Sequence, residues 1–389
     1  MLKKSILFLT NAYPDFDTSY RGIFLKEMAT FLRAEGYKIY VVTPKIYRKS
    51  PIFEDQNGIK VYRFPFPSGN RLLIQYEKVP YLRVLIYYFT GLILTFLVVL
   101  KSRCQLIHVH WAIPTGLIGV FLGSIFRKPV IVTIHGSDLR MAVKNSGLIR
   151  KIFLYVCKKA KCLTCVSEFQ KREMEEMGLS GEKISVFPMG IERRFLEIGE
   201  DRKGHLRDQP PIIVSNRNLL PMYNVSLFIR AIPLVLKEEP KAKFLIAGEG
   251  PEKTHLEKEA ENLGVASSVR FLGRIPHDKM PQLLGHSDIY VSTSLYDGTS
   301  VSLLEAMATG TFPVVTNIPA NREWVREGEN GFLINPDDEA ILATKIIDAI
   351  RNKELLTRAR ERNLRIAEQN ASWENQIKKL KEVYEKGLR

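Results

Sequence analysis

The feature that most constrains the fold is an alternation of strands and helices that occurs twice along the chain. In the first half, apolar runs typical of buried strands lie at 4–10, 38–44, 106–110, 130–135, 162–167 and 183–188. In the second half, similar runs lie at 212–216, 243–248, 269–273, 288–294, 312–316 and 331–336. Strands that alternate with helices favour parallel sheets with right-handed crossovers. We therefore expect an α/β protein with two doubly wound, Rossmann-like domains.

A polar stretch, GEDRKGHLRDQPP, separates the two halves and is typical of a linker. We predict a first domain over 1–198, a linker over 199–211, a second domain over 212–372 and a C-terminal amphipathic helix over 373–389. A length of 389 residues suits two domains. Doubly wound sheets bind ligands at the carboxyl ends of their strands, so two such domains facing one another would place a site in the cleft between them.

The positive charge is confined to the first half. The chain has 57 Lys and Arg against 42 Asp and Glu, which gives a net charge of +15. Residues 1–197 hold 30 of these bases and 15 of the acids, so the second half is neutral. This asymmetry predicts an anionic partner for the first domain, either a membrane surface or an anionic acceptor. We expect no nucleic acid, because no nucleic-acid-binding motif is visible.

Residues 84–100 form an uncharged run of 17 residues, at the short end for a membrane-spanning helix. A span would place strands 4–10 and 106–110 on opposite sides of the bilayer and break the sheet. We therefore favour a core helix or a helix lying on the membrane surface. Basic residues flank this run and the later helix near 147–161, and either segment could contact anionic lipid: Arg71, Lys78, Arg83, Lys101, Arg103, Lys144, Arg150, Lys151, Lys158, Lys159 and Lys161.

The N-terminus, MLKKSILFLTNAYP, has no small-residue cleavage pattern of a signal peptide. Four cysteines are present, and Cys162 and Cys165 form a CxxC without a second pair at zinc-site spacing. Thiols without a signal peptide suggest a reducing cytoplasm. We therefore expect a cytoplasmic protein, peripheral on the inner face of the cytoplasmic membrane, with no bound metal and no cofactor.

The stretch YDGTSVSLLEAMATG at 296–310 predicts a loop followed by a helix. Ser300 is a good N-cap, and Gly310 stands where a helix stop is expected. Asp297 then lies in the loop, and Glu305 lies about a turn and a half inside the helix. The N–H groups of a helix start favour an anion, so a nearby carboxylate should bind something else. Sugar hydroxyls next to a phosphate would satisfy both features.

This stretch, with VRFLGRIP before it and TFPVVTNIPANREWVREGENGFLINP after it, resembles the retaining family-4 glycosyltransferases of the GT-B fold. That family carries two glutamates in an E-x7-E motif. Glu305 matches the second glutamate, and Asp297, eight residues earlier, lies where the first usually lies. Other segments agree in order along nearly the whole chain: HVHWAIPTG, HGSD, VSEFQKREMEEMG, KISVFPMGIERRF, AGEGP and the C-terminal helix. The resemblance implies a GT-B fold with a cleft between the domains and a C-terminal helix that packs back toward the first domain.

The resemblance also implies roles for individual residues. Glu305 would hold the ribose hydroxyls of a nucleotide, and Asp297 would bind hydroxyls of the donor sugar. His135 resembles the first-domain histidine that reaches the donor sugar near its reacting carbon. The family's remaining donor contacts fall on the phosphate-clamping Arg217, the base-holding backbone of Arg274 and Ile275, the close-approach glycine Gly22, and the helix-start N–H groups of Gly298, Thr299, Ser300 and Val301. Candidates for the acceptor cleft are His108, His110, Ser137 and Asp138, although a core role for the two histidines is equally open.

The chain departs from the family pattern near its phosphate clamp. The family's clamping lysine usually precedes a glycine, whereas this chain has Tyr223 and Asn224 and one extra residue. Arg217 would then act alone, or Tyr223 would substitute as a hydrogen-bond donor. Asp297 is one methylene shorter than the usual glutamate, which could alter the choice of donor sugar. The leaving diphosphate would be stabilised by Arg217 and helix N–H groups without a metal.

Three functions remain open from the sequence. The first is a transferase that uses a sugar nucleotide, with UDP-sugars preferred over GDP-mannose, and that acts on a lipid-linked or cell-envelope glycan. The second is another GT-B enzyme, such as a sugar-nucleotide epimerase. The third is a non-catalytic sugar- or lipid-binding relative, supported by the missing Lys-Gly pair. A DxD at Asp15–Asp17 could suggest a metal-dependent transferase, but its place in the first strand–helix loop favours a phosphate or surface loop.

Overall fold

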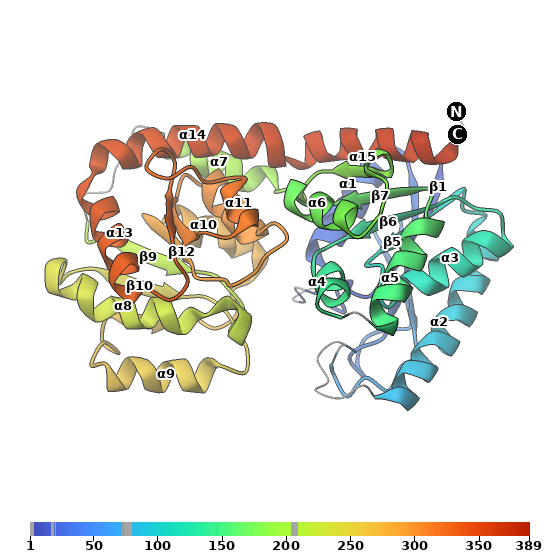
Figure 1. Ribbon diagram of the computed structural model, residues 1–389, viewed down its shortest axis with the longest axis horizontal. Helices are drawn as coiled ribbons and strands as arrows, with labels where there is room; N and C mark the ends of the chain where they lie inside the picture. The colour runs from blue at the N-terminus through green and yellow to red at the C-terminus, as the bar shows by residue number, and fades with distance from the viewer. Residues whose placement is uncertain are drawn as a thin grey trace. The chain divides into compact units, whose positions relative to one another are not determined.

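The structure is a computed structural model that describes residues 4–16, 19, 21–71, 73, 80–145, 147–203 and 209–389 (Figure 1). The chain forms two compact units. Unit 1 comprises Met1–Pro188 and Gln376–Arg389, and unit 2 comprises Met189–Asn375. Each unit is built on one largely parallel sheet between helices, as the strand–helix alternation predicts.

Unit 1 contains an eight-stranded sheet in the order β3-β4-β2-β1-β5-β6-β7-β8, in which only the β3–β4 pair is antiparallel. After β1 the chain moves outward to β2, and after β5 it moves the other way to β6, so the winding reverses between β1 and β5. The strands are β1 (Ser5–Thr10), β2 (Lys38–Pro44), β3 (Phe53–Gln56), β4 (Ile59–Phe64), β5 (Leu106–His110), β6 (Val130–Ile134), β7 (Cys162–Cys165) and β8 (Ile184–Val186).

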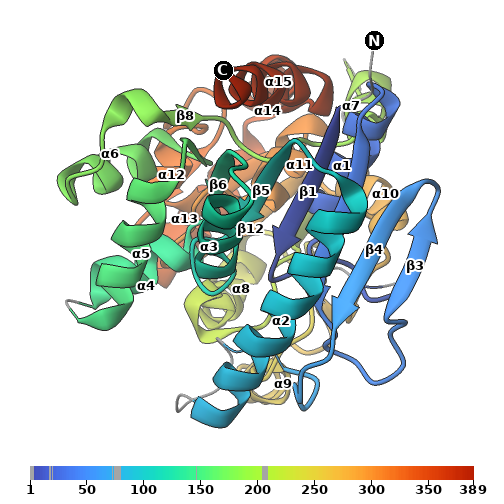
Figure 2. The same ribbon diagram turned by 90° about the vertical axis from the view of Figure 1, so that its right-hand side faces the viewer.

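The two faces of this sheet are covered by different helices (Figure 2). Leu7, Leu9, Ile107 and Val109 alternate along β1 and β5 and join the core beneath α2, α3 and α5. The opposite face carries Phe8 and the histidines of β5. The helices of this unit are α1 (Ile23–Ala34), α2 (Tyr81–Ser102), α3 (Gly116–Ile125), α4 (Ser137–Lys144), α5 (Leu148–Lys159) and α6 (Glu168–Glu176).

Unit 2 contains a six-stranded parallel sheet in the order β11-β10-β9-β12-β13-β14, and its winding reverses between β9 and β12. The strands are β9 (Ile212–Ser215), β10 (Lys243–Ile246), β11 (Val269–Phe271), β12 (Ile289–Ser292), β13 (Phe312–Thr316) and β14 (Phe332–Ile334). The helices are α7 (Arg193–Asp201), α8 (Val225–Glu238), α9 (Lys253–Asn262), α10 (Met280–Gly285), α11 (Val301–Ala308), α12 (Pro319–Arg322), α13 (Glu339–Arg351) and α14 (Lys353–Ala371).

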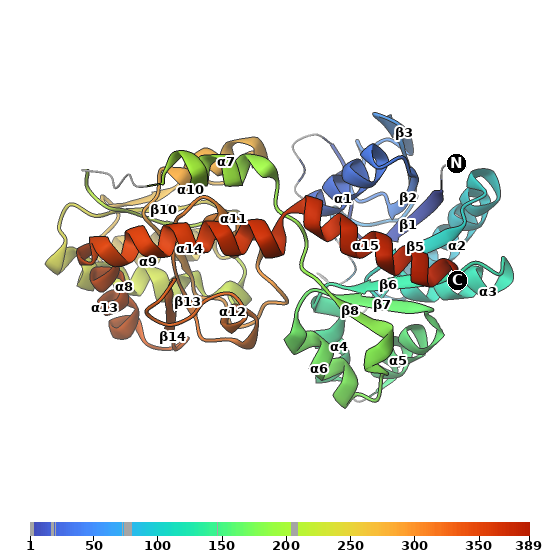
Figure 3. The same ribbon diagram turned by 90° about the horizontal axis from the view of Figure 1, so that it is seen from above.

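The C-terminal helix α15 (Trp373–Leu388) belongs to both units. At its start, Trp373 packs on Gly190 of unit 2, where an added Cβ would lie 2.2 Å from the indole. Its later turns lie across β1, β5 and β6 (Figure 3), where Tyr384 is fully buried. The C-terminal helix therefore packs back on the first unit, as the resemblance implies.

The unit boundaries differ from the predicted domain boundaries. The first crossing lies at Pro188 rather than at residue 198, because α7 packs with α10, α11 and α14 of unit 2. Residues 199–203, predicted from the sequence to begin a linker, continue α7 and its end, and 204–208 lie outside the described residues. The second crossing lies inside α15, so the last helix is not a separate element.

The hairpin formed by β3 and β4 was not predicted. Its turn is Asn57-Gly58, with both residues in the left-handed region at φ 52° and φ 87°. Asn-Gly between two short apolar segments is a strong signal for this kind of turn. The signal was therefore present, but the polar residues of the exposed edge strand β3, FEDQ, concealed the strand.

Candidate active site

The site residues of unit 2 gather where the winding of its sheet reverses. Arg217 follows β9 by two residues, and the loop 293–300 connects β12 to α11. Because β9 and β12 are neighbours, their carboxyl ends bring these two loops together. A reversal of winding is the usual ligand crevice of an open α/β sheet.

Arg217 is held by partners on three sides. Its Nη2 donates to Asp297 Oδ2 at 2.6 Å, and its Nη1 donates to Ser300 Oγ at 2.5 Å. The guanidinium stacks on the ring of Tyr223, 4.2 Å from the ring centroid. Its Nε is buried and has no hydrogen-bond partner among the described residues. Arg217 is thus fixed in position and retains one N–H that a ligand oxygen could accept.

Burial and charge pull in opposite directions on this ion pair. Burial raises the pKa of Asp297, while the neighbouring Arg217 lowers it, and the pKa ends above its ordinary value. Burial alone would lower the pKa of Arg217, but Asp297 and nearby tyrosines raise it overall. The guanidinium therefore stays charged, and the pair is an electrostatic unit rather than two independent groups.

The loop that carries Arg217 rests on the glycines of the AGEGP segment. An added Cβ would lie 2.1 Å from the Arg217 carbonyl oxygen at Gly248 and 2.1 Å from the Leu219 carbonyl oxygen at Gly250. The Leu219 N–H also donates to the Glu249 carbonyl at 3.0 Å. This pair of glycines has a structural purpose, because larger residues would displace the loop that positions Arg217.

Helix α11 begins as the sequence predicts. Ser300 is its N-cap, and its Oγ accepts the Leu303 N–H at 3.3 Å. Gly310 follows the helix with φ 70°. Gly298, Thr299 and Val301 surround this cap, so the N–H groups of the first turn lie beside Arg217 and form a positive end for an anion.

Glu305 is buried in the second turn of α11, and its carboxylate contacts a residue that sequence reasoning missed. His277 Nε2 lies 2.8 Å from Glu305 Oε1. His277 Nδ1 lies 3.1 Å from Glu192 Oε1 and 3.0 Å from Arg194 Nη2. Two residues before His277 stands Ile275, so proximity to the predicted base-holding segment was the available signal.

The remaining donor candidates flank these groups. Tyr223 lies in a short 3-10 turn (Pro221–Tyr223), which the Thr293 hydroxyl ties to the end of β12 by donating to the Tyr223 carbonyl at 3.1 Å. Arg274 and Ile275 lie in the loop between β11 and the turn His277–Lys279. Arg274 is exposed, and Ile275 packs against the core beneath α11.

In unit 1, His135 follows β6 and lies beside the end of β5. Its Nε2 is 3.2 Å from His110 Nδ1, and its ring packs on Trp111 and Phe24. Burial lowers the pKa of His135 to about 3. The pKa of His110 is also lowered, first by burial and then by its histidine neighbours. Both imidazoles are therefore neutral at pH 7, and one donates its N–H to the other.

The acceptor-cleft candidates occupy different environments. His108 lies in the core, where its Nδ1 meets Tyr384 Oη at 2.8 Å and its Nε2 meets Thr133 Oγ1 at 2.7 Å. This placement favours the core role left open by the sequence. Asp138 is also buried, and it accepts the N–H of Ala112 at 2.8 Å and that of Gly136 at 3.2 Å, which ties two loops together. Ser137 is exposed beside it.

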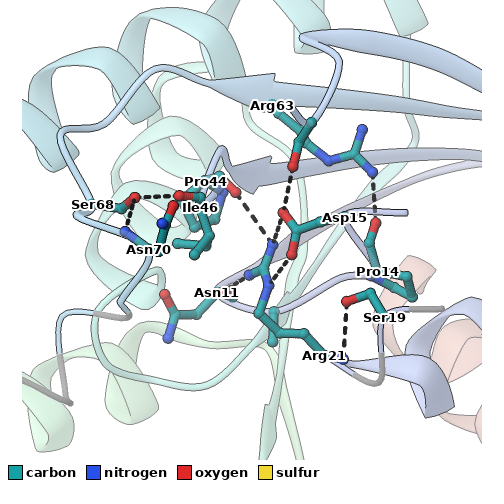
Figure 4. A network of polar contacts seen from close by, with 12 residues as sticks. Asn11, Pro14, Asp15, Ser19, Arg21, Pro44, Ile46, Arg63, Ser68 and Asn70 are labelled. Carbon is teal, nitrogen blue, oxygen red and sulfur yellow. Dashed lines mark hydrogen bonds and ion pairs between the residues drawn. The ribbon is translucent and has the colours of Figure 1, made fainter. Parts of the chain in front are cut away.

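The loop after β1 is fixed by a polar network (Figure 4). Asp15 accepts two hydrogen bonds from Arg21, from Nε at 2.7 Å and from Nη2 at 2.9 Å, and a third from the Ser50 hydroxyl at 3.2 Å. Arg21 also donates to the Asn11 carbonyl at 2.9 Å. Asp15 is thus committed to the loop, and Asp17 of the DxD lies outside the described residues.

Gly22 ends this loop as the N-cap of α1, with φ 69°. An added Cβ would lie 2.4 Å from the Ala12 carbonyl oxygen. The glycine is therefore required by the loop's own path, whatever the loop binds. All four cysteines are free and buried, so the CxxC of β7 faces protein interior.

The two units thus supply different chemistry. Unit 2 offers a fixed guanidinium, a helix N-terminus and a buried carboxylate within a few residues of one another. This set suits a nucleoside diphosphate: the first two groups match phosphate oxygens and the carboxylate matches ribose hydroxyls. Unit 1 offers neutral imidazoles, which can exchange hydrogen bonds with sugar hydroxyls.

Comparison with known proteins gives the same division of the chain. The model for Glycosyltransferase Family 4 matches residues 22–195, and the model for Glycosyl transferases group 1 matches residues 197–365. TuaC of Bacillus subtilis (strain 168), a glycosyltransferase assigned to teichuronic acid biosynthesis, is 26% identical and covers 80% of this chain and 81% of its own. The phosphatidylinositol N-acetylglucosaminyltransferase of Arabidopsis thaliana includes a polypeptide that is 23% identical over 91% of this chain and 76% of its own.

Solved structures show the same fold. HepE of Anabaena, in complex with UDP, superimposes with a TM-score of 0.77 at 18% identity and covers 98% of this chain and 99% of its own. The match extends over both units, and the two family models together leave little besides the termini unmatched. This chain is therefore a transferase of the family-4, or group 1, glycosyltransferases with the GT-B fold.

Proposed function

We propose that this glycosyltransferase moves a sugar, with retention of configuration, from a nucleoside diphosphate sugar to a hydroxyl of a lipid-linked or cell-envelope glycan. The preferred donor is a UDP-sugar, and GDP-mannose is the second choice. The reaction takes place at the cytoplasmic face of the membrane, where the protein is peripheral. The observation that carries the proposal is the arrangement of Arg217, the N-terminus of α11 and Glu305 around one end of the second sheet.

Departure of the nucleotide develops negative charge on the leaving diphosphate. Arg217 is charged and already oriented by Asp297 and Ser300, so it needs little reorganisation to meet that charge. The first-turn N–H groups of α11 add a second, fixed positive end. These groups supply the stabilisation that a metal ion supplies in other transferases, so we expect a metal-independent reaction. A front-face attack, in which the leaving phosphate accepts the acceptor proton, accounts for retention.

Glu305 is the proposed ribose ligand. Its Oε1 is engaged by His277 at 2.8 Å, which fixes the orientation of the carboxylate while its other oxygen can accept a hydroxyl proton. His277 thus acts as a positioning residue, and Glu192 and Arg194 hold it from the other side.

The preference for donor and acceptor rests on similar proteins and on charge. HepE binds UDP, and the Arabidopsis relative acts in phosphatidylinositol glycosylation by its name. TuaC is assigned to a cell-wall polysaccharide. The positive charge of residues 1–197 matches an anionic acceptor or lipid surface.

Calorimetric titration with UDP, GDP and ADP, without metal, tests the donor site. We expect one nucleotide to bind and Glu305→Ala to weaken its affinity by about tenfold or more, since a buried ligand to the ribose is lost. Glu238→Ala, on the exposed side of α8, is the matched control and should bind as the wild type does. The proposal fails if Glu305→Ala binds like the wild type, or if binding requires added divalent metal.

A further inference from the structure

Helix α2 carries two apolar stripes rather than one. Its inner stripe, buried against the sheet and α3, is Tyr87, Gly91, Thr95, Val98 and Val99. Its outer stripe is exposed by 38% to 72% at Leu82, Leu85, Phe89, Ile93, Phe96, Leu97 and Leu100. Both stripes recur every three or four residues, and at 3.6 residues per turn they lie on roughly opposite sides of the helix. A helix that only covers a sheet needs the inner stripe alone.

The exposed apolar surface continues onto α3. Phe121 and Ile125 of α3 are each about half exposed. The two helices touch, because Gly91 of α2 lies against Ile118 of α3 and the Phe96 ring lies 5.1 Å from that of Phe126. We call the outer stripe of α2 together with Phe121 and Ile125 the outer apolar face. Apolar surface of this extent on a soluble protein marks an interaction site.

The surroundings of the outer apolar face are almost purely basic. Residues 81–161 contain twelve Lys and Arg and a single carboxylate, Asp138, which is buried and bonded to backbone N–H groups. Basic side chains also line a hollow of about 260 Å³ at the end of α3, with Ser124 among them: Arg127, Lys128, Lys159 and Lys161. A surface that is apolar in the middle and basic around it is complementary to a leaflet with anionic headgroups.

We infer that the outer apolar face inserts into the headgroup and acyl boundary of an anionic phospholipid leaflet, with lipid phosphates at the basic hollow. This inference rests on the membrane location in the proposed function and names the surface that makes the contact. Helix α2 does not cross the bilayer, although it is long and apolar enough to do so. Its inner stripe packs on the sheet, and the strands on either side of it, β4 and β5, belong to that same sheet.

A second copy of the chain is a poorer occupant of the same surface. Pairing two outer apolar faces would bring two basic surroundings together, and the segment has no exposed carboxylate to neutralise them. Anionic lipid removes that repulsion and also covers the apolar side chains.

Site-specific fluorescence tests the inference directly. Since all four native cysteines are buried, a cysteine at Phe89→Cys can be labelled selectively with an environment-sensitive dye. Ile52→Cys is the matched control, because Ile52 is equally exposed in unit 1 but lies outside the face. We expect vesicles of phosphatidylcholine and phosphatidylglycerol to shift the emission of the dye at 89 to the blue, and nitroxide lipids to quench it. The dye at 52 should not respond.

Vesicle flotation gives the second measurement. Leu85→Glu with Phe89→Glu should lower the vesicle partition coefficient by about tenfold or more, whereas Ile52→Glu should leave it unchanged. Binding should also weaken as salt is added, because the basic residues act through screened charge.

Each contrary outcome has a distinct meaning. If the protein floats with vesicles but the dye at 89 stays in water, while a dye at Leu148→Cys on α5 shifts, the outer apolar face is not the docking surface. If no vesicle binds although UDP titration is normal, docking is overturned and the transferase stands. If the dye at 89 shifts without vesicles as protein concentration rises, the occupant is a second copy.

Discussion

Tyr223 is the residue at which the phosphate clamp of this chain departs from its family pattern. It stands near the place of a clamping lysine, yet in the structure its ring lies under the guanidinium of Arg217 at 4.2 Å. An aromatic ring beneath a cation orients it and partly compensates its burial. Tyr223 therefore contributes by positioning Arg217, which differs from the hydrogen-bond donation suggested by the sequence.

Two substitutions separate these roles. Tyr223→Phe keeps the ring, so we expect nucleotide affinity close to that of the wild type. Tyr223→Ala removes the stack, and affinity should fall about threefold to thirtyfold, in line with a partly buried cation–π contact. Calorimetric titration with the bound nucleotide measures both. Equal losses in the two variants would show instead that the hydroxyl is the functional group.

Asp138 gives the first unit a specific response to pH. Burial raises the pKa of Asp138 to about 6 from 3.8, against the opposing effect of the N–H bonds from Ala112 and Gly136. Between these two values the folded state holds a proton that the unfolded chain has released. Folding is therefore weakened as the pH rises across that window, by about 3 kcal/mol at most from this group.

Comparison with Asp138→Asn isolates that contribution. The difference in free energy of unfolding between wild type and variant should change from pH 4 to pH 6, with the wild type losing stability relative to the variant, and should be constant above pH 6. Denaturant titration at several pH values measures it. A difference that stays flat across the window would mean that Asp138 is ionised throughout.

At the scale of elements, helix α11 shows how much of the site the sequence contains. Its N-cap at Ser300, its stop at Gly310 and the position of Glu305 follow from local residue preferences alone, and the structure has all three. The strand order of both sheets likewise follows from alternation and right-handed crossovers, apart from the edge hairpin. Elements defined by short-range rules were therefore predictable.

Pairings across long sequence distances were not predictable. Arg217 and Asp297 are 80 residues apart, and their ion pair exists only because β9 and β12 are neighbours in the sheet. The contact of His277 with Glu305 depends in the same way on where the turn after β11 meets α11. His108 and His110 alternate normally along β5, but only the packing of α15 decides that His108 belongs to the core.

The C-terminal helix α15 is bound to unit 1 through that histidine. Tyr384→Phe would leave His108 Nδ1 buried without its partner, and we expect a loss of about 1–3 kcal/mol in the free energy of unfolding. Lys381→Ala removes an exposed ion pair with Glu35 on the same helix and should change it by no more than about 0.5 kcal/mol. Urea denaturation measures both variants. Similar losses would show that α15 is held by its surface.

At the scale of the whole molecule, charge and chemistry are divided between the two halves. The basic excess lies in residues 1–197, and within it residues 81–161 are nearly free of carboxylates. The groups suited to a nucleotide lie in unit 2, and every residue of that set belongs to Met189–Asn375. This division predicts that binding of the nucleotide and transfer of the sugar can be impaired separately.

His135 provides the sharpest separation, because it belongs to unit 1. His135→Ala should lower kcat about tenfold or more, as expected when a hydrogen bond to the reacting sugar is lost, and should leave nucleotide affinity unchanged. His255→Ala, on α9 of unit 2, is the control. Since burial lowers the pKa of His135 to about 3, it is neutral above pH 5, and no inflection near pH 6.5 should come from it. An inflection there that disappears in His135→Ala would show that the working imidazole is exposed and takes up a proton.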